Sequence, residues 1–139
     1  MSEENKAIVR RNFEETWNKG NMAVADEIFT ANYVGHDPAG PELRGPEGMK
    51  QQVGTYRTAF PNVQFSVEDQ IAAGDMVATR WTARGTHQGD LMGIAPTGKQ
   101  VTVTGITIER LANGKVEESW TNWDTMGMMQ QLGVVPQPG

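Results

Sequence analysis

Cysteine is absent from this 139-residue chain, which excludes disulfides, thiolate metal sites, iron–sulfur clusters and cysteine nucleophiles. Basic residues are few: 12 Lys and Arg stand against 17 Asp and Glu, and no basic run is longer than Arg10-Arg11. This charge pattern does not favour binding to nucleic acid. No apolar run approaches the roughly 18 residues of a membrane span. We therefore expect neither a nucleic-acid nor a membrane partner.

Targeting and metal-binding patterns are also missing. The N-terminal residues lack a basic stretch followed by an apolar one, so no secretory signal is predicted and a cytoplasmic location is expected. His36 and His87 are the only histidines, and they do not form a metal-ligand set by spacing. No dinucleotide fingerprint, P-loop, zinc motif or Gly-x-Ser-x-Gly is present. These absences argue against a metal site and against serine hydrolase chemistry.

What remains is the composition of one globular domain over residues 1–139. Hydrophobic residues make up 37% of the chain and charged residues 21%. Two separate cores would leave about 70 residues each, close to the lower limit for stable folding. One core of this size is large enough to enclose an internal pocket.

Helical spacing dominates the first 60 residues. Val9 and Trp17 belong to one apolar face of a first helix, which should end near Gly20, a residue suited to a left-handed cap. A short second helix is expected over 22–29. A third helix over 46–60 begins at a proline, which is favoured in a first turn.

The second half alternates with the period of a β-strand. An Asn113-Gly114 pair joins its last two strands and is typical of a type I′ hairpin turn. Helices followed by strands predict an α+β fold, with three N-terminal helices on one face of a strongly curved, mostly antiparallel sheet that encloses a pocket. The expected strands cover 63–69, 76–87, 100–111 and 116–123, and a terminal helix covers 125–132.

A series of short motifs runs in order through nearly the whole chain. They are Trp17-x-x-Gly20, Tyr33-x-x-His36, Gly45-x-x-Gly48, Phe60-Pro61, Gly85-Thr86-His87-x-Gly89, Pro96-Thr97-Gly98-Lys99 and Gly114-Lys115-Val116-x-Glu118-x-Trp120-x-x-x-Asp124. Each motif alone is weak. Their series resembles the SnoaL-like polyketide cyclases of the ester cyclase type, within the nuclear transport factor 2-like superfamily.

The resemblance implies a nuclear transport factor 2-like α+β cone, usually a homodimer. It also implies an enzyme that closes a ring on a polyketide ester by intramolecular aldol condensation, without metal or organic cofactor. Isomerases, dehydratases, epoxide hydrolases and noncatalytic ligand-binding modules share this superfamily, so they stay as alternatives. An epoxide hydrolase would use two carboxylates around an arginine, for which Asp69, Arg80 and Asp124 are a loose match.

Asp124 is the first catalytic candidate, because the resemblance places the family's general acid/base there. It follows Trp120 and Trp123 at a strand end, so we expect it low in an apolar cavity, where desolvation would raise its pKa toward neutrality. Alternation puts Trp120, Asn122 and Asp124 on one face of the strand. The alternative is that Asp124 caps the helix that begins at Thr125.

His36 is the second catalytic candidate. It ends an extended segment near the expected cavity mouth, where it, Asn122 or a bound water would polarise an enolate; the alternative is a bond to a loop carbonyl. His87 is expected to organise a flap over 88–96 and to approach the ligand. Arg80 would bind an enolate or carboxylate, or else form a salt bridge across the sheet.

The remaining candidates for substrate binding are aromatic or flexible side chains. They suit a flat hydrophobic compound, although core packing explains them as well. The expected partners are a small hydrophobic substrate and, as the resemblance implies, a second copy of the chain, docked through the open face of the sheet. These candidates are Trp17, Tyr33, Tyr56, Met92 and Trp120.

Overall fold

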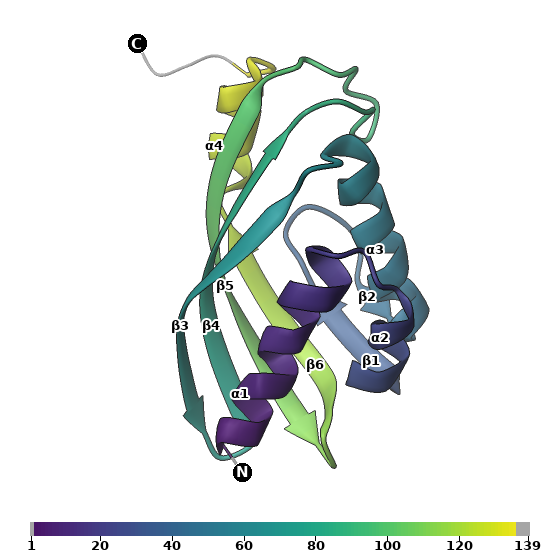
Figure 1. The fold of residues 1–139 in the computed structure, drawn as a ribbon, viewed down its shortest axis with the longest axis vertical. Coiled ribbons are helices and arrows are strands. Elements are labelled where there is room, and N and C mark those ends of the chain that lie inside the picture. The colour runs from purple at the N-terminus through teal and green to yellow at the C-terminus, as the bar shows by residue number, and fades with distance from the viewer. Residues whose placement is uncertain (1, 136–139) are drawn as a thin grey trace.

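The computed structural model describes residues 2–135 and shows helices packed on one concave face of a curved sheet (Figure 1). Within these residues the sheet has six strands in the order β2-β1-β6-β5-β4-β3. The helices are α1 (Ser2–Arg11), the π-helical turn η1 (Asn12–Trp17), α2 (Ala23–Ile28), α3 (Gly45–Ala59) and α4 (Thr125–Leu132). The strands are β1 (Phe29–His36), β2 (Leu43–Arg44), β3 (Gln64–Ala73), β4 (Met76–Thr86), β5 (Gln100–Ala112) and β6 (Lys115–Trp123).

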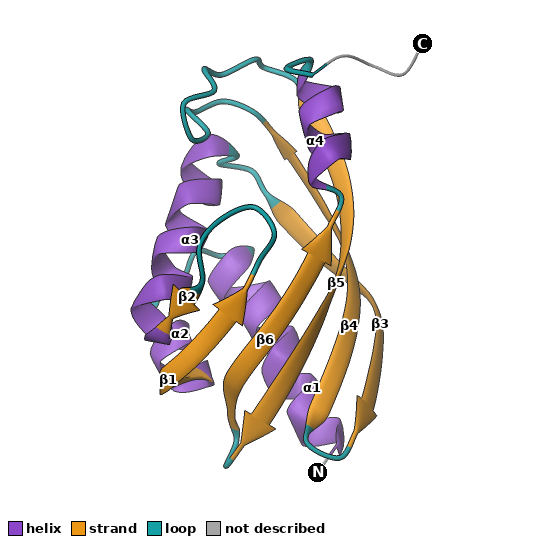
Figure 2. Cartoon of the chain, turned by 180° about the vertical axis from the view of Figure 1, so that it is seen from behind, coloured by secondary structure: helices purple, strands orange, loops and turns teal. Residues whose placement is uncertain are grey.

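The sheet confirms the predicted α+β architecture and adds two strands to it. Strands β3 to β6 form the expected antiparallel meander. Strand β1 extends this meander by pairing parallel to β6, as Figure 2 shows, and β2 pairs antiparallel to β1. The sheet is therefore mixed, and the N-terminal half of the chain contributes to the cavity wall as well as to the helical layer.

The first helix is not regular to its end. At residue 12 it widens into the π-helical turn η1, in which the Asn18 amide donates to Phe13 O, five residues earlier, at 3.0 Å. Asn12, Phe13 and Trp17 are all buried. A π-helical turn is common at functional sites because it redirects side chains. Gly20, with φ of +69°, follows η1 in the predicted left-handed conformation.

The sheet bends around an aromatic cluster. Trp81 lies across Gly105 of the neighbouring strand, so closely that a Cβ added there would come within 2.3 Å of the indole. The Trp81 ring also packs on Phe65 and Phe13, with centroid distances of 5.0 and 6.4 Å. A register shift between Val67 and Asp69 adds curvature, as β-bulges do.

Two glycine substitutions test this packing. Gly105→Ala should lower the free energy of unfolding by about 1–3 kcal/mol, because the new methyl group overpacks the contact with Trp81. Gly54→Ala in α3, where an added Cβ meets nothing within 4 Å, should raise it by about 0.5–1 kcal/mol. Urea denaturation followed by circular dichroism measures both. Equal effects at the two sites would contradict the proposed role of Gly105.

Candidate active site

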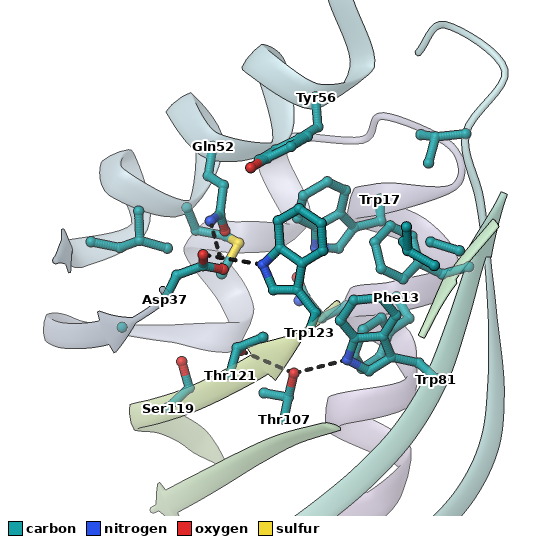
Figure 3. Close-up of a pocket in the computed structure, with 18 of the residues that line it drawn as sticks. Phe13, Trp17, Asp37, Gln52, Tyr56, Trp81, Thr107, Ser119, Thr121 and Trp123 are labelled. Carbon is teal, nitrogen blue, oxygen red and sulfur yellow. Dashed lines mark hydrogen bonds between the residues drawn. The ribbon is translucent and has the colours of Figure 1, made fainter. Parts of the chain in front are cut away.

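A cavity lies between the helical layer and the concave face of the sheet, with an empty volume of about 910 Å³ when its open mouth is included. Most of its wall is aromatic or aliphatic, as Figure 3 shows. The predicted hydrophobic pocket is therefore present. Large rings in the wall come from Phe13, Trp17, Tyr56, Trp81 and Trp123.

Glu109 is the buried carboxyl group of this cavity. Alternation along β5 turns it inward, opposite Val77 of β4 and Ser119 of β6, and only 3% of its surface is exposed. No group within residues 2–135 forms a hydrogen bond to its carboxyl. Burial raises the pKa of Glu109 to about 8, since the charged form loses its hydration. At neutral pH this side chain is a neutral carboxylic acid.

A pair of hydroxyl groups lies next to Glu109 in the sheet. The Tyr33 hydroxyl and Ser119 Oγ are 2.6 Å apart and form a buried hydrogen bond. Burial is the main reason why the pKa of Tyr33 is raised, and the charges of Glu109 and Asp37 add to that effect. Tyr33 thus lies within electrostatic range of both carboxyl groups and stays a neutral phenol.

Asp37 follows the last residue of β1 and also lines the cavity. One carboxylate oxygen accepts the backbone amide of Ala39 at 2.8 Å and the indole N–H of Trp123 at 3.2 Å, and the other accepts Gln52 Nε2 at 3.3 Å. Figure 3 shows the bonds to Trp123 and Gln52. The three donors come from three different parts of the chain. They fix the carboxylate among half-buried residues, so Asp37 lies nearer the cavity mouth than Glu109 does.

Three of the predicted substrate-binding aromatics lie in the cavity wall. Trp17, Tyr33 and Tyr56 line it, and the Tyr56 ring stands edge-on to Trp123 with centroids 6.1 Å apart. Burial raises the pKa of Tyr56 to about 12, with a smaller contribution from Asp37. The predicted location of these residues is confirmed, and their contact with a substrate stays a prediction.

The expected location of Asp124 is wrong. Its side chain is exposed, lies outside the cavity lining, and accepts the Gly127 amide at 2.8 Å at the start of α4. This is the N-cap alternative, in which the carboxylate stabilises otherwise unpaired amides of the helix. A catalytic role for Asp124 therefore has no support from its position.

Trp120 and Asn122 were also expected in the cavity and lie on the opposite face of β6. The inward side chains of this strand are Ser119, Thr121 and Trp123. Trp120 is 37% exposed and stacks on the imidazole of His36 at a centroid distance of 5.8 Å. The prediction assumed that a tryptophan marks the buried face, and here it marks the convex one.

His36 contributes to the cavity rim, as expected from its place at a strand end. Its ring, however, pairs with a residue of the convex face: Nε2 lies 2.8 Å from Glu118 Oε2. The hydrogen bond with His36, followed by one from Arg110, lowers the pKa of Glu118. His36 therefore lies at the rim with its imidazole Nε2 already paired with Glu118.

Three further candidates lie outside the cavity. Arg80 projects from the convex face, where its Nε donates to Asp69 Oδ2 at 2.8 Å, so the salt-bridge alternative is correct. Met92 is 58% exposed on the loop after β4. His87 is fully buried beneath that loop, and its Nδ1 lies 3.1 Å from Thr97 Oγ1. It is bonded to the end of that loop, but it does not line the cavity, so the expected approach to a ligand has no support from its position.

Sequence reasoning missed both carboxyl groups of the cavity. Asp37 follows His36 directly, and a polar side chain just after a predicted strand end was a signal that could have identified it. Glu109 shares the parity of Val101 and Val103, but Ile106 and other apolar residues occupy the opposite parity. The hydrophobic pattern therefore pointed to the wrong face of β5 at this position.

Residues 2–135 hold no cluster of three or more His, Asp or Glu side chains that could bind a metal ion. Over the same residues, no helix is both long and apolar enough to cross a membrane.

An α+β cone with helices on the concave face of a bent sheet, and a ligand-sized cavity between them, defines the nuclear transport factor 2-like class. Within that class the model of the SnoaL-like polyketide cyclases matches residues 7–132. The chain belongs to the SnoaL-like polyketide cyclase family, as its motifs indicate.

Relatives of known name agree with this assignment. The chain is 30% identical over 129 residues to the aklanonic acid methyl ester cyclase DnrD of Streptomyces peucetius, covering 91% of this chain and 88% of that protein. It is 28% identical to the nogalonic acid methyl ester cyclase of Streptomyces nogalater, covering 84% and 89% of the two chains.

Solved structures show the same fold. A protein from Jannaschia sp. CCS1, described as a SnoaL-like polyketide cyclase, superposes with a TM-score of 0.88 at 26% identity and covers 97% of this chain and 95% of its own. A Catenulispora acidiphila protein with a ketosteroid isomerase-like fold gives a TM-score of 0.79 at 18% identity over 94% and 97% of the two chains. The latter likeness concerns the fold alone.

The burial of Glu109 predicts a dependence of stability on pH. Because the folded protein binds this proton more tightly than the unfolded chain, the contribution is complete below about pH 4.5. This contribution is lost progressively as pH rises from there toward 8. Glu109→Gln lacks this dependence. Melting temperatures between pH 5 and 9 should therefore fall more steeply for the wild type, and parallel curves would show that Glu109 ionises freely in the folded state.

Proposed function

We propose that this protein is a cofactor-independent cyclase that closes a ring in a hydrophobic polyketide ester by an intramolecular aldol reaction. The observation that carries the proposal is a largely apolar cavity that holds two carboxyl groups in different environments, in a chain of the SnoaL-like family. Groups whose environments differ in this way suit proton removal at one point and proton donation at another. The relatives that are named methyl ester cyclases support the substrate class.

Asp37 is the base in this proposal. Its carboxylate removes a proton from the carbon next to the ester carbonyl, and the resulting enolate carbon attacks a ketone carbon of the same molecule. One carbon–carbon bond forms, and the ketone oxygen takes up a proton to become a hydroxyl group. No group leaves, so substrate and product are isomers. The proton on Asp37 then returns to solvent through the nearby mouth.

The hydrogen bonds of Asp37 support this role. The amide of Ala39 and the side chains of Trp123 and Gln52 hold the carboxylate in one orientation, which reduces the reorganisation needed before proton transfer. Asp124, the base that the family resemblance implies, is outside the cavity and already bound to the amide of Gly127.

Two asparagine substitutions separate these carboxylates. Asp37→Asn should lower kcat on aklanonic acid methyl ester by on the order of 100-fold or more, because the amide cannot take up the proton. Asp124→Asn should leave kcat within about twofold, since asparagine also caps helices well. Chromatography that separates the open-chain and cyclised isomers measures both rates. If Asp124→Asn lowered kcat strongly and Asp37→Asn did not, Asp124 would be the base.

We further propose that the chain forms a homodimer through the convex face of its sheet. Ile106, Ile108 and Trp120 are exposed there on adjacent strands β5 and β6. A contiguous apolar face on an otherwise charged protein is typical of an interaction site. A two-fold axis through this face would let the same patch cover itself, and the concave cavities of both protomers would remain open.

A matched pair of charge substitutions tests the dimer. Ile108→Lys should convert the protein to a monomer in size-exclusion chromatography with light scattering, because it buries a charge in the proposed interface. Thr55→Lys adds the same charge at an exposed position of α3 and should leave the mass unchanged. A wild type that is already monomeric at micromolar concentration would refute the interface.

A further inference from the structure

Two buried polar groups of the cavity wall have no hydrogen-bond partner within residues 2–135. Glu109 lacks a hydrogen bond to its carboxyl, as described above. Asn12, which η1 turns into the same cavity, is 4% exposed, and its Oδ1 has no hydrogen-bond partner within residues 2–135. Buried polar atoms are almost always paired. Unpaired ones that face a cavity indicate that a ligand supplies the missing partner.

The other polar groups of this region are already engaged. The hydroxyls of Tyr33 and Ser119 bond to each other. Thr107 accepts the indole N–H of Trp81 at 3.0 Å, and its Oγ1 lies 3.0 Å from that of Thr121. These hydroxyl groups would have to break an existing hydrogen bond before they could donate to a ligand. The carboxyl of Glu109 would not, because it has no hydrogen bond within residues 2–135.

We infer that Glu109 and Asn12 form an oxygen-binding subsite in the buried part of the cavity, where Glu109 donates a hydrogen bond and then its proton to a ketone oxygen of the substrate. This inference rests on the proposed cyclisation and completes its proton balance. The proton that leaves Glu109 becomes the hydrogen of the new hydroxyl group. Asn12 Oδ1 accepts a hydrogen bond from that hydroxyl, and Glu109 regains a proton from solvent after the product leaves.

The subsite also fixes the direction in which a substrate binds. Its ketone must reach the buried region beside Glu109, while its ester and the acidic carbon next to it stay near Asp37. Aromatic walls between these points suit a flat ring system. The substrate class is therefore a polycyclic ester whose ketone is the leading group, and a compound without an oxygen at that end should bind more weakly.

Binding of two small probes tests the subsite without any turnover. 1-Tetralone carries a ketone on a fused ring, and tetralin has the same ring without oxygen. Calorimetry at pH 6.5 should show that the wild type binds 1-tetralone about tenfold more tightly, the effect of one good hydrogen bond. Glu109→Leu should remove this preference. A wild type that binds both probes equally, or a preference that persists in Glu109→Leu, would overturn the inference.

The dependence on pH gives a second readout, which does not require the leucine variant to fold. Because the donor is a carboxylic acid, the preference of the wild type for 1-tetralone should fade as pH is raised from 6.5 to 9.5. Glu109→Gln keeps an N–H donor, so its preference should remain constant over that range. A wild-type preference that does not change with pH would assign the hydrogen bond to another group.

Turnover then separates this inference from the proposed function. With aklanonic acid methyl ester, Glu109→Gln should bind substrate but lose on the order of 100-fold or more in kcat, since an amide does not transfer a proton. If the wild type prefers 1-tetralone but does not cyclise this or related esters, the subsite stands and the cyclase proposal fails. If cyclisation proceeds normally in Glu109→Gln, the acid role fails and the cyclase proposal stands.

Discussion

The contact between Trp81 and Gly105 is the constraint on which the cavity depends. With no side chain at Gly105, the indole of Trp81 lies against this residue of β5 and packs on Phe13 and Phe65. The indole N–H then binds Thr107, the next inward residue of β5. The strands therefore bend around aromatic rings. Because these rings keep the helical layer away from the sheet, a cavity remains between the two layers.

The architecture could be predicted from the sequence, but the inward faces of β5 and β6 could not. Helical spacing, strand alternation and the Asn113-Gly114 turn were sufficient for the helices and the meander. Along β5, however, Ile108 points to the convex face and Glu109 to the cavity. A carboxyl group that faces the cavity next to an isoleucine that faces outward reverses the usual hydrophobic signal at this position. Trp120 misled the interpretation of β6 for the same reason.

The candidate catalytic group shows a second limit of sequence reasoning. The family pattern and its position after a strand favoured Asp124, yet the same position is ideal for capping α4, and the cap is what forms. Asp37 is fixed by Gln52 and Trp123, which lie 15 and 86 residues away. Residues so far apart in the sequence come together only when the sheet is complete. The spacing of neighbouring residues in the sequence therefore cannot reveal these contacts.

The parallel pairing of β1 with β6 has a consequence for how the chain is made. Tyr33 binds Ser119 across 86 residues, so the first strand has no place in the sheet until the last one exists. During synthesis, α1 to α3 leave the ribosome long before β6 does, and their apolar faces must wait for it. Long-range closure of this kind slows folding. The nascent chain therefore depends on its final strand both to bury its helices and to create the cavity.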